Sequence, residues 1–233
     1  MHSRLTPAEY QTLTQAETFA GLDEDVSAAL IRNGRVVRLR CGTTRPAARM
    51  ELRGSLCGLA SGAAKLSRKM ASGRELAISI IEPGTWLCAG APDDALPAYE
   101  LEPRADVLLL VVEQPELQQL VRMYPALLPA LLKLNARHVQ RLDALLEELH
   151  DMPLATRVAR QLQALGKRFG AHGNSGASRI GIRVSQQDIA DLTGACRQRV
   201  NVEIKEFERR GLLRMAGGHL ELQPGFSSAL LAS

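Results

Sequence analysis

The first half of the chain carries short apolar runs separated by turn residues, a pattern that predicts β-strands. Residues 76–80 alternate between large apolar and small side chains (Leu-Ala-Ile-Ser-Ile), which is the period of a half-buried strand. Pro83-Gly84 suits the centre of a type II turn, and residues 18–25 predict a short helix that leads into residues 26–31. Further strand-like runs lie at 36–39, 56–59 and 107–112. Several short strands with turns between them predict a β-roll or sandwich.

The second half changes to helical spacing, beginning at Glu116. After Pro125 and Pro129, which interrupt the chain, a long helix is predicted to run to about His150. Its seam positions recur at alternating spacings of three and four residues, and these are Leu128, Leu131, Asn135, His138, Leu142, Leu145 and Leu149. Such a heptad pattern favours a partner helix, here the same helix of a second copy in a parallel homodimer. The alternative is packing within one domain, which needs a wider apolar stripe, and part of one is supplied by Leu127, Leu134 and Leu146.

A second amphipathic helix is predicted after a break at residues 151–153 (Asp-Met-Pro), since Asp and Pro are both favoured at helix starts. Its apolar positions lie three or four residues apart, and they are Leu154, Val158, Leu162, Leu165 and Phe169. The Gly-, Asn- and Ser-rich residues 171–177 then predict a surface loop.

Residues 184–222 carry the pattern that indicates a function. Ser185 and Asp188 have the spacing of a capping box at the start of a short helix. Residues 193–195 (Thr-Gly-Ala) predict a tight turn, and a second helix is predicted from about Cys196 to Arg210. Helix, short Gly-containing turn and helix together form a helix-turn-helix. A β-hairpin with Gly217-Gly218 at its tip is expected to follow as a wing. The inward positions of the two helices are small or apolar, and they are Ile189, Ala190, Leu192, Val200, Ile204 and Phe207.

The charge distribution agrees with a polyanionic partner for the last third of the chain. Residues 151–233 hold 12 Lys or Arg against 7 Asp or Glu, whereas residues 1–150 hold 17 against 18. A basic segment of this kind favours binding to a polyanion, although many solvated helices carry a similar excess. The longest strongly apolar run, residues 107–112, is too short to span a bilayer. Four scattered cysteines favour reduced thiols in a cytoplasm over a disulfide scaffold.

The stretch VSQQDIADLTGACRQRVNVEIKEFERRGLL, residues 184–213, resembles the DNA-binding domain of the Crp–Fnr family, the regulators related to the bacterial cyclic-AMP receptor protein. LRGSLCGLA, residues 52–60, lies where that family has its Lys-Gly-Ser strand. LAISIIEPGTWL, residues 76–87, lies where it has a strand, a Gly turn and the entry to its ligand loop. The resemblance implies an α+β protein, whose expected parts are a cyclic-nucleotide-binding-like β-roll over 1–124, a dimerisation helix over 125–150 and a winged helix-turn-helix domain over 151–233.

In that family the start of the second helix enters the major groove, where base edges differ in their donors and acceptors. The residues there are Arg197, Gln198 and Arg199. Gln198 stands where many members have a Glu that accepts from cytosine, and Gln is better suited to adenine. The two arginines are expected to contact guanine or a phosphate, a solvated charged face being the alternative. Val202 stands where well-studied members have a second base-contacting Arg, so we expect a different operator.

Four further polar residues are expected on the DNA side of the motif. Asn201 is expected to face the DNA, and Lys205 to contact phosphate or solvent. Ser185 and Gln187, at the start of the first helix, could bind a phosphate. Capping alone also explains Ser185.

The resemblance implies an effector pocket, for which the candidate residues are Trp86, Cys88, Ala89, Leu96, Asn135 and His138. The family holds a cyclic nucleotide with Gly-Glu and Arg-Ser pairs, but here Ala89 replaces the Glu and Leu96-Pro97 replace Arg-Ser. Leu142 and Asp143 stand where the cyclic-AMP binder has Thr and Ser. A buried cyclic phosphate without a cation has a large desolvation cost. We therefore do not expect cyclic AMP to bind in the usual way, and the effector is unknown.

Alternatives remain for the individual residues of this pocket and for cofactors. Trp86 is also suited to packing, and His138 to a satisfied polar role in the helix seam rather than to haem ligation. The cysteines lack the close spacing of an iron–sulfur site. We predict no cofactor and no metal site.

The expected partners are double-stranded DNA with a pseudo-palindromic site and a second copy of the chain, with RNA polymerase as a further candidate and no membrane. An enzyme is not expected, since the sequence has no Ser/His/Asp arrangement, metal cluster or phosphate loop. The alternative function is a ligand-binding or protein-interaction module whose helix-turn-helix no longer binds DNA. The basic start of the second helix argues against that alternative.

Overall fold

The computed structural model describes residues 5–19, 21–42, 49–70, 73, 75–89, 99–172 and 176–226. The chain divides into two compact units. The first contains residues 1–74 and 79–142, and the second contains residues 75–78 and 143–233. The expected domain boundaries at 124/125 and 150/151 remain a proposal.

The sequence pattern did not predict the first helix of this unit, and it placed the start of the second too early. Helix α1 spans Pro7–Thr14 and α2 spans Glu24–Asn33, while residues 18 and 19, where the short helix was expected to begin, form a turn. A capping box starts α1, because the Thr6 hydroxyl accepts from the Glu9 amide while the Glu9 carboxylate accepts from the Thr6 amide, and Pro7 suits the first turn. Helix α3 spans Gln114–Met123.

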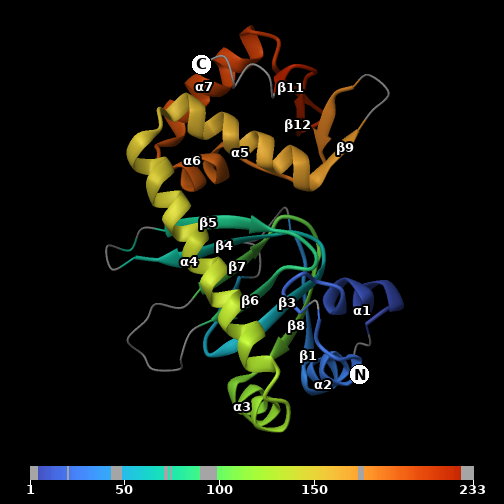
Figure 1. The fold of residues 1–233 in the computed structure, drawn as a ribbon. Helices are drawn as coiled ribbons and strands as arrows, with labels where there is room; N and C mark the ends of the chain where they lie inside the picture. Colours follow the sequence, from blue (N-terminus) through green and yellow to red (C-terminus); the bar gives the residue numbers. More distant parts are fainter. Residues whose placement is uncertain are drawn as a thin grey trace. The chain divides into compact units, whose positions relative to one another are not determined.

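Two antiparallel four-stranded sheets form the β-rich region, with strand orders β1-β8-β3-β6 and β2-β7-β4-β5 (Figure 1). Their strands are β1 Arg35–Leu39, β2 Met50–Leu52, β3 Ser55–Ser61, β4 Ala64–Lys69, β5 Glu75–Ile81, β6 Trp86–Ala89, β7 Tyr99–Pro103 and β8 Val107–Val112. The predicted strands correspond to β1, β3, β5 and β8. The sequence analysis missed β2, β4, β6 and β7. In β2, β4 and β7 charged residues interrupt the apolar ones, and β6 is only four residues long.

Burial within the sheets follows the tertiary packing more than the local pattern. All six residues of β8 are buried, as expected for a strand that pairs with β1 on one side and β3 on the other. In β5 the predicted alternation is wrong: Ala77 is buried, whereas Leu76 and Ile78 are only partly covered. The expected turn at Pro83-Gly84 is present, with Gly84 at a φ of 85° that favours glycine.

Helix α4 spans Leu127–Asp151 and contains the predicted seam. Pro125 precedes it, and Pro129 lies in its first turn, where no backbone N–H is needed for the helix. Leu127, Leu131 and Leu134 are buried in the hydrophobic core of the first unit. One face of the helix therefore packs within its own chain.

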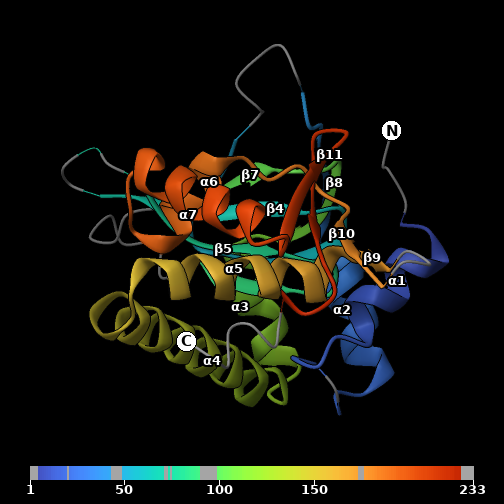
Figure 2. The same cartoon turned by 90° about the horizontal axis from the view of Figure 1, so that it is seen from above.

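The described part of the second unit contains the end of α4, three further helices and a four-stranded sheet of order β11-β12-β10-β9. Helix α5 spans Leu154–Phe169, α6 spans Gln186–Thr193 and α7 spans Arg197–Arg209, and α6 and α7 lie against α5 (Figure 2). The expected loop at 171–177 is wrong at its start, because β9 (Gly170–His172) pairs with β10 (Ser178–Ile180). The predicted wing is confirmed as β11 (Leu213–Ala216) and β12 (His219–Leu222).

Candidate nucleic-acid interface and effector pocket

The start of α6 is fixed by a capping box, as the sequence predicted. The Ser185 hydroxyl accepts from the Asp188 amide at 3.1 Å, and the Asp188 carboxylate accepts from the Ser185 amide at 2.9 Å. Two backbone donors at the helix start are thereby satisfied. The Ser185 hydroxyl therefore already has hydrogen-bond partners within the protein.

The turn between α6 and α7 depends on Gly194. This residue has a φ of 64° in the left-handed region, where a side chain is disfavoured. A Cβ atom added at Gly194 would lie 2.6 Å from Cδ2 of Leu149. The Ala195 amide donates to the Ala190 carbonyl at 3.0 Å, and Ala190 is fully buried. Small residues therefore let the two helices and the end of α4 approach closely.

Helix α7 has a buried face and an exposed face. Val200, Ile204 and Phe207 are buried, as predicted. The exposed residues of the helix and its N-cap are polar or charged apart from Cys196 and Val202, and they are Arg197, Gln198, Arg199, Lys205 and Arg209. At the far end, Arg209 pairs with Glu206 at 2.6 Å. The cationic start of the helix is thus turned towards solvent.

The remaining predicted DNA-binding residues are held within the motif. Asn201 is only partly exposed, and its side-chain oxygen accepts from the Gln186 amide group at 2.8 Å. Gln187 is exposed and donates to the Asp191 carboxylate at 2.7 Å. These contacts tie α6 to α7 and hold Gln187 on its own helix. Asn201 and Gln187 would have to exchange these partners to contact DNA.

Basic side chains outside the predicted set also lie on the surface of this unit. Arg183 precedes α6, and Arg214 lies on the wing; both are exposed. The wing turns at Gly217 and Gly218, whose φ values are 55° and 77°, the combination of a type I′ hairpin. The two arginines were missed, although their positions directly beside the motif could have indicated them.

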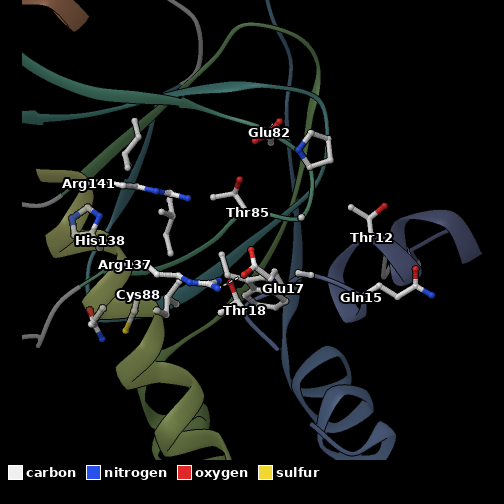
Figure 3. Close-up of a pocket in the computed structure, with 18 of the residues that line it drawn as sticks. Thr12, Gln15, Glu17, Thr18, Glu82, Thr85, Cys88, Arg137, His138 and Arg141 are labelled. Atoms are coloured by element: carbon white, nitrogen blue, oxygen red, sulfur yellow. Dashed lines mark hydrogen bonds and ion pairs between the residues drawn. The ribbon is translucent and has the colours of Figure 1, made fainter. Parts of the chain in front are cut away.

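A cavity of about 640 Å³ lies in the first unit, a size that suits a small organic ligand. Helix α1 and the segment after it, the turn at 82–85, β6 and α4 all contribute to its walls (Figure 3). Its floor includes Leu52, Leu66 and Leu134. Arg137 and Arg141 extend into it from α4 (Figure 3). The sequence analysis missed both arginines.

The polar side chains of this cavity are partly paired with each other. Arg137 forms an ion pair with Glu17, and Glu82 also lines the cavity. The Tyr99 hydroxyl and His138 Nε2 are 2.8 Å apart, and their rings meet edge to face. Burial, with a smaller contribution from the nearby Arg141, holds the pKa of His138 below its usual value. The lowered pKa favours the neutral imidazole of His138 over the imidazolium.

Four of the six candidate effector residues line this cavity: Trp86, Cys88, Asn135 and His138. Trp86 is almost fully buried, donates to the Leu13 carbonyl at 3.1 Å and meets Phe19 edge to face. Its role is therefore mainly packing. Burial raises the pKa of the Cys88 thiol, and a hydrogen bond with Asn135 opposes that shift.

The structure does not describe the side chains of the other two candidate effector residues, Ala89 and Leu96. The Leu96 position lies outside the described residues, as does Pro97. Ala89 ends β6, and nothing is described of its side chain. Among the described residues, no group of three or more His, Cys, Asp or Glu side chains could hold a metal ion. None of the described helices combines the length and the apolar character needed to cross a bilayer.

The seven predicted seam residues of α4 differ in burial and in their contacts. Leu131 is buried in its own unit, and His138 contacts Tyr99 of the same chain, so both side chains have partners within their own chain. Leu128 is 50% exposed, and Asn135 is exposed while its amide donates to the Leu131 carbonyl. The other three are partly buried, and they are Leu142, Leu145 and Leu149.

Known proteins resemble this chain in both sequence and fold. Residues 156–223 match the family described as the Crp-like helix-turn-helix domain. A protein of Mycobacterium tuberculosis, named as a CRP-like cAMP-activated global transcriptional regulator, is 28% identical over 219 residues, which cover 89% of this chain and 92% of that protein.

Solved structures extend the likeness to the whole fold. The c-di-GMP-responsive global regulator CLP of Xanthomonas campestris has a TM-score of 0.70 at 20% identity, over 86% of this chain and 99% of that one. A CRP/FNR-family transcriptional regulator of Thermus thermophilus has a TM-score of 0.66 at 20% identity, over 85% of this chain and 99% of that one. At such identities the likeness concerns the fold alone, and it confirms the predicted β-sheet domain, long helix and helix-turn-helix.

Proposed function

We propose that this chain, whose residues 156–223 match the Crp-like helix-turn-helix domain, is a Crp-like transcription regulator that binds double-stranded DNA sequence-specifically, as a homodimer in the cytoplasm. The matches to a helix-turn-helix domain and to a transcriptional regulator support the prediction of a regulator rather than an enzyme. RNA polymerase remains a candidate partner.

The observation that supports DNA binding most directly is the exposed, cationic start of α7. Arg197, Gln198 and Arg199 are all exposed there, at the helix end that enters the major groove in helix-turn-helix proteins. Arginine forms bidentate hydrogen bonds with guanine, and glutamine does so with adenine. We therefore propose a half-site in which Gln198 contacts adenine and the arginines contact guanine or phosphate. Lys205, two turns further along, is proposed to contact phosphate.

Dimerisation is proposed through the face of α4 that is not covered by its own chain. Four large apolar residues of this helix are at least half exposed, namely Leu128 at 50%, Leu132 at 63%, Val139 at 54% and Leu146 at 64%. With Asn135, Leu142 and Leu149 they recur at alternating spacings of four and three residues, which is a heptad seam. This register keeps four of the predicted seam residues. It replaces Leu131, His138 and Leu145 by their neighbours Leu132, Val139 and Leu146.

A two-fold dimer of this kind is proposed to bind a pseudo-palindromic site, with half-site centres about 34 Å apart, one turn of B-DNA. The charge distribution supports this, because the excess of Lys and Arg lies in residues 151–233. Arg183 and Arg214 add exposed cations beside α6 and on the wing, where they could contact the backbone.

The effector site is proposed to be the 640 Å³ cavity of the first unit. Arg137 and Arg141 offer cations to an anionic ligand, although Glu17 already pairs with Arg137 and Glu82 adds a second carboxylate. Ala89, Leu142 and Asp143 differ from the residues that hold cyclic AMP in the family. We therefore propose that the cavity takes an effector other than cyclic AMP.

The DNA-binding proposal is tested with Arg197→Ala and Arg199→Ala in the full-length protein. An operator is first enriched from genomic fragments, and its affinity is then measured by fluorescence anisotropy. Because a bidentate pair with a base contributes roughly 1–3 kcal/mol, each variant is expected to bind the operator at least about tenfold more weakly. Both variants should remain dimers in sedimentation experiments.

Arg209→Ala is the matched control, since Arg209 lies on the same helix but pairs with Glu206 at its other end. Its affinity is expected to stay close to that of the wild type. Unchanged affinity in both Arg197→Ala and Arg199→Ala would contradict the proposal. A protein that shows no salt-dependent binding even to random DNA would support the alternative, a ligand-binding or protein-interaction module.

A further inference from the structure

Helix α7 carries one large apolar side chain on its exposed face. The helix has four apolar residues, of which Val200, Ile204 and Phe207 are buried. The fourth, Val202, is 64% exposed. The first part of the helix around it is otherwise polar on the solvent side, with exposed Arg199 and Lys205. Val202 therefore does not contribute to the core of the second unit, and its exposure calls for another explanation.

The position of Val202 places it beside the residues proposed to contact bases. Residues three and four apart on a helix lie on the same face. Val202 is four residues after Gln198, three after Arg199 and three before Lys205, so it lies at the centre of the cationic face. A β-branched side chain in a helix has one strongly preferred χ1 rotamer. The two methyl groups are thus held in a fixed direction before DNA binds.

The chemistry of the major groove offers one apolar group to such a side chain. Base edges there present hydrogen-bond donors and acceptors, except for the 5-methyl group of thymine. Valine cannot replace the water that hydrates a polar edge, and burying that edge unpaired is unfavourable. Contact between the valine methyl groups and a thymine methyl group instead removes apolar surface from water on both sides.

We propose that Val202 determines specificity by contacting the 5-methyl group of a thymine in each half-site, next to the base pair contacted by Gln198. This inference rests on the proposed DNA binding and adds to it a particular base and a particular atom. The contact favours thymine over deoxyuridine, which differs from it only by the methyl group.

The test removes only that methyl group from the DNA. The operator enriched with the full-length protein is resynthesised with deoxyuridine in place of each thymine in turn, and affinities are measured for the wild type and for Val202→Ala. One thymine of each half-site is expected to be sensitive in the wild type, with about fourfold weaker binding per half-site, the factor that corresponds to one buried methyl group. Val202→Ala is expected to lose this sensitivity, since the two changes remove the same contact.

Lys205→Ala is the control on the same face. It should weaken binding to the thymine and deoxyuridine operators by the same factor, because a phosphate contact does not depend on the base. Since Val202 is exposed, Val202→Ala should also leave the midpoint of thermal unfolding unchanged.

The possible failures are distinguishable. An operator without thymine, an operator insensitive to deoxyuridine at every thymine, or equal sensitivity in the wild type and Val202→Ala would overturn the role of Val202 and leave DNA binding intact. Failure to enrich any sequence would overturn the proposed sequence-specific binding, and the inference with it.

Discussion

At the scale of single residues, the motif depends on a few side chains with local roles. Ser185 and Asp188 satisfy each other's backbone amides at the start of α6. Gly194 takes a backbone conformation that disfavours side chains and lies directly beside Leu149. The capping box fixes the start of α6, and the glycine allows the close turn between α6 and α7. The placement of the exposed arginines of α7 therefore depends also on residues outside α7.

Gly194→Ala is expected to destabilise the protein for two reasons. The left-handed backbone costs roughly 1–2 kcal/mol for a residue with a Cβ atom, and the new methyl group would lie 2.6 Å from Cδ2 of Leu149. Gly211→Ala is the matched control, because Gly211 has a φ of 70° but no atom within 4 Å of an added Cβ. Urea unfolding followed by circular dichroism should show a larger loss for Gly194→Ala. Equal losses would mean that Leu149 moves aside without cost.

At the scale of elements, α4 has two faces with different partners. Leu127, Leu131 and Leu134 pack into the first unit, whereas Leu132, Val139 and Leu146 are exposed. Leucines occur in adjacent pairs at 127–128, 131–132 and 145–146. The sequence pattern is therefore compatible with two seams one residue apart. Only the packing of the helix against its own unit distinguishes them.

The proposed seam predicts which substitutions dissociate the dimer. Val139→Glu and Leu146→Glu each place two carboxylates against each other across a two-fold axis, and such like-charge contacts cost several kcal/mol. The dissociation constant measured by analytical ultracentrifugation should rise at least about a hundredfold. Ala144→Glu, at an exposed position two residues before Leu146 and off the seam, should leave it nearly unchanged. A wild-type chain that sediments as a monomer, or an intact dimer in both seam variants, would contradict the register.

At the scale of the whole molecule, the two units carry different chemistry. The first has a cavity lined by apolar and polar side chains, two arginines among them, and the second has the exposed cationic start of α7. A regulator needs a free-energy coupling between an effector site and a DNA site. The proposed effector cavity and the proposed DNA-binding face are on separate units, as such coupling between distinct sites requires.

Cyclic AMP is expected to leave the DNA affinity of this protein unchanged. The carboxylates of Glu17 and Glu82 line the cavity, and the residues that hold the cyclic nucleotide in the family are replaced at Ala89, Leu142 and Asp143. Operator affinity should be measured by anisotropy with and without saturating cyclic AMP. The M. tuberculosis relative, which is named as cAMP-activated, is the positive control. A change of fivefold or more in this protein, which is in the range of ordinary allosteric coupling, would contradict the prediction.

The helix-turn-helix was predictable from sequence because its signals are local. A capping box, a glycine at a helix end and apolar residues three or four apart are all set within a few residues of each other. The same local signals predicted the break between α4 and α5 and the wing. For the candidate DNA interface, the sequence also identified Arg197, Gln198 and Arg199, which are indeed exposed. The sequence could not show that Asn201 accepts a hydrogen bond from Gln186, or that Gln187 donates one to Asp191.

The sequence by itself thus determined the order of the elements in the second half of the chain and the chemistry of the exposed start of α7. The tertiary structure alone decided how eight strands pair into two sheets, that Arg137 and Arg141 share a cavity with α1, and which face of α4 remains uncovered. These features depend on contacts between residues far apart in the chain. A periodic pattern states that a helix has an apolar side, but the direction of that side is set by the surface against which the helix packs.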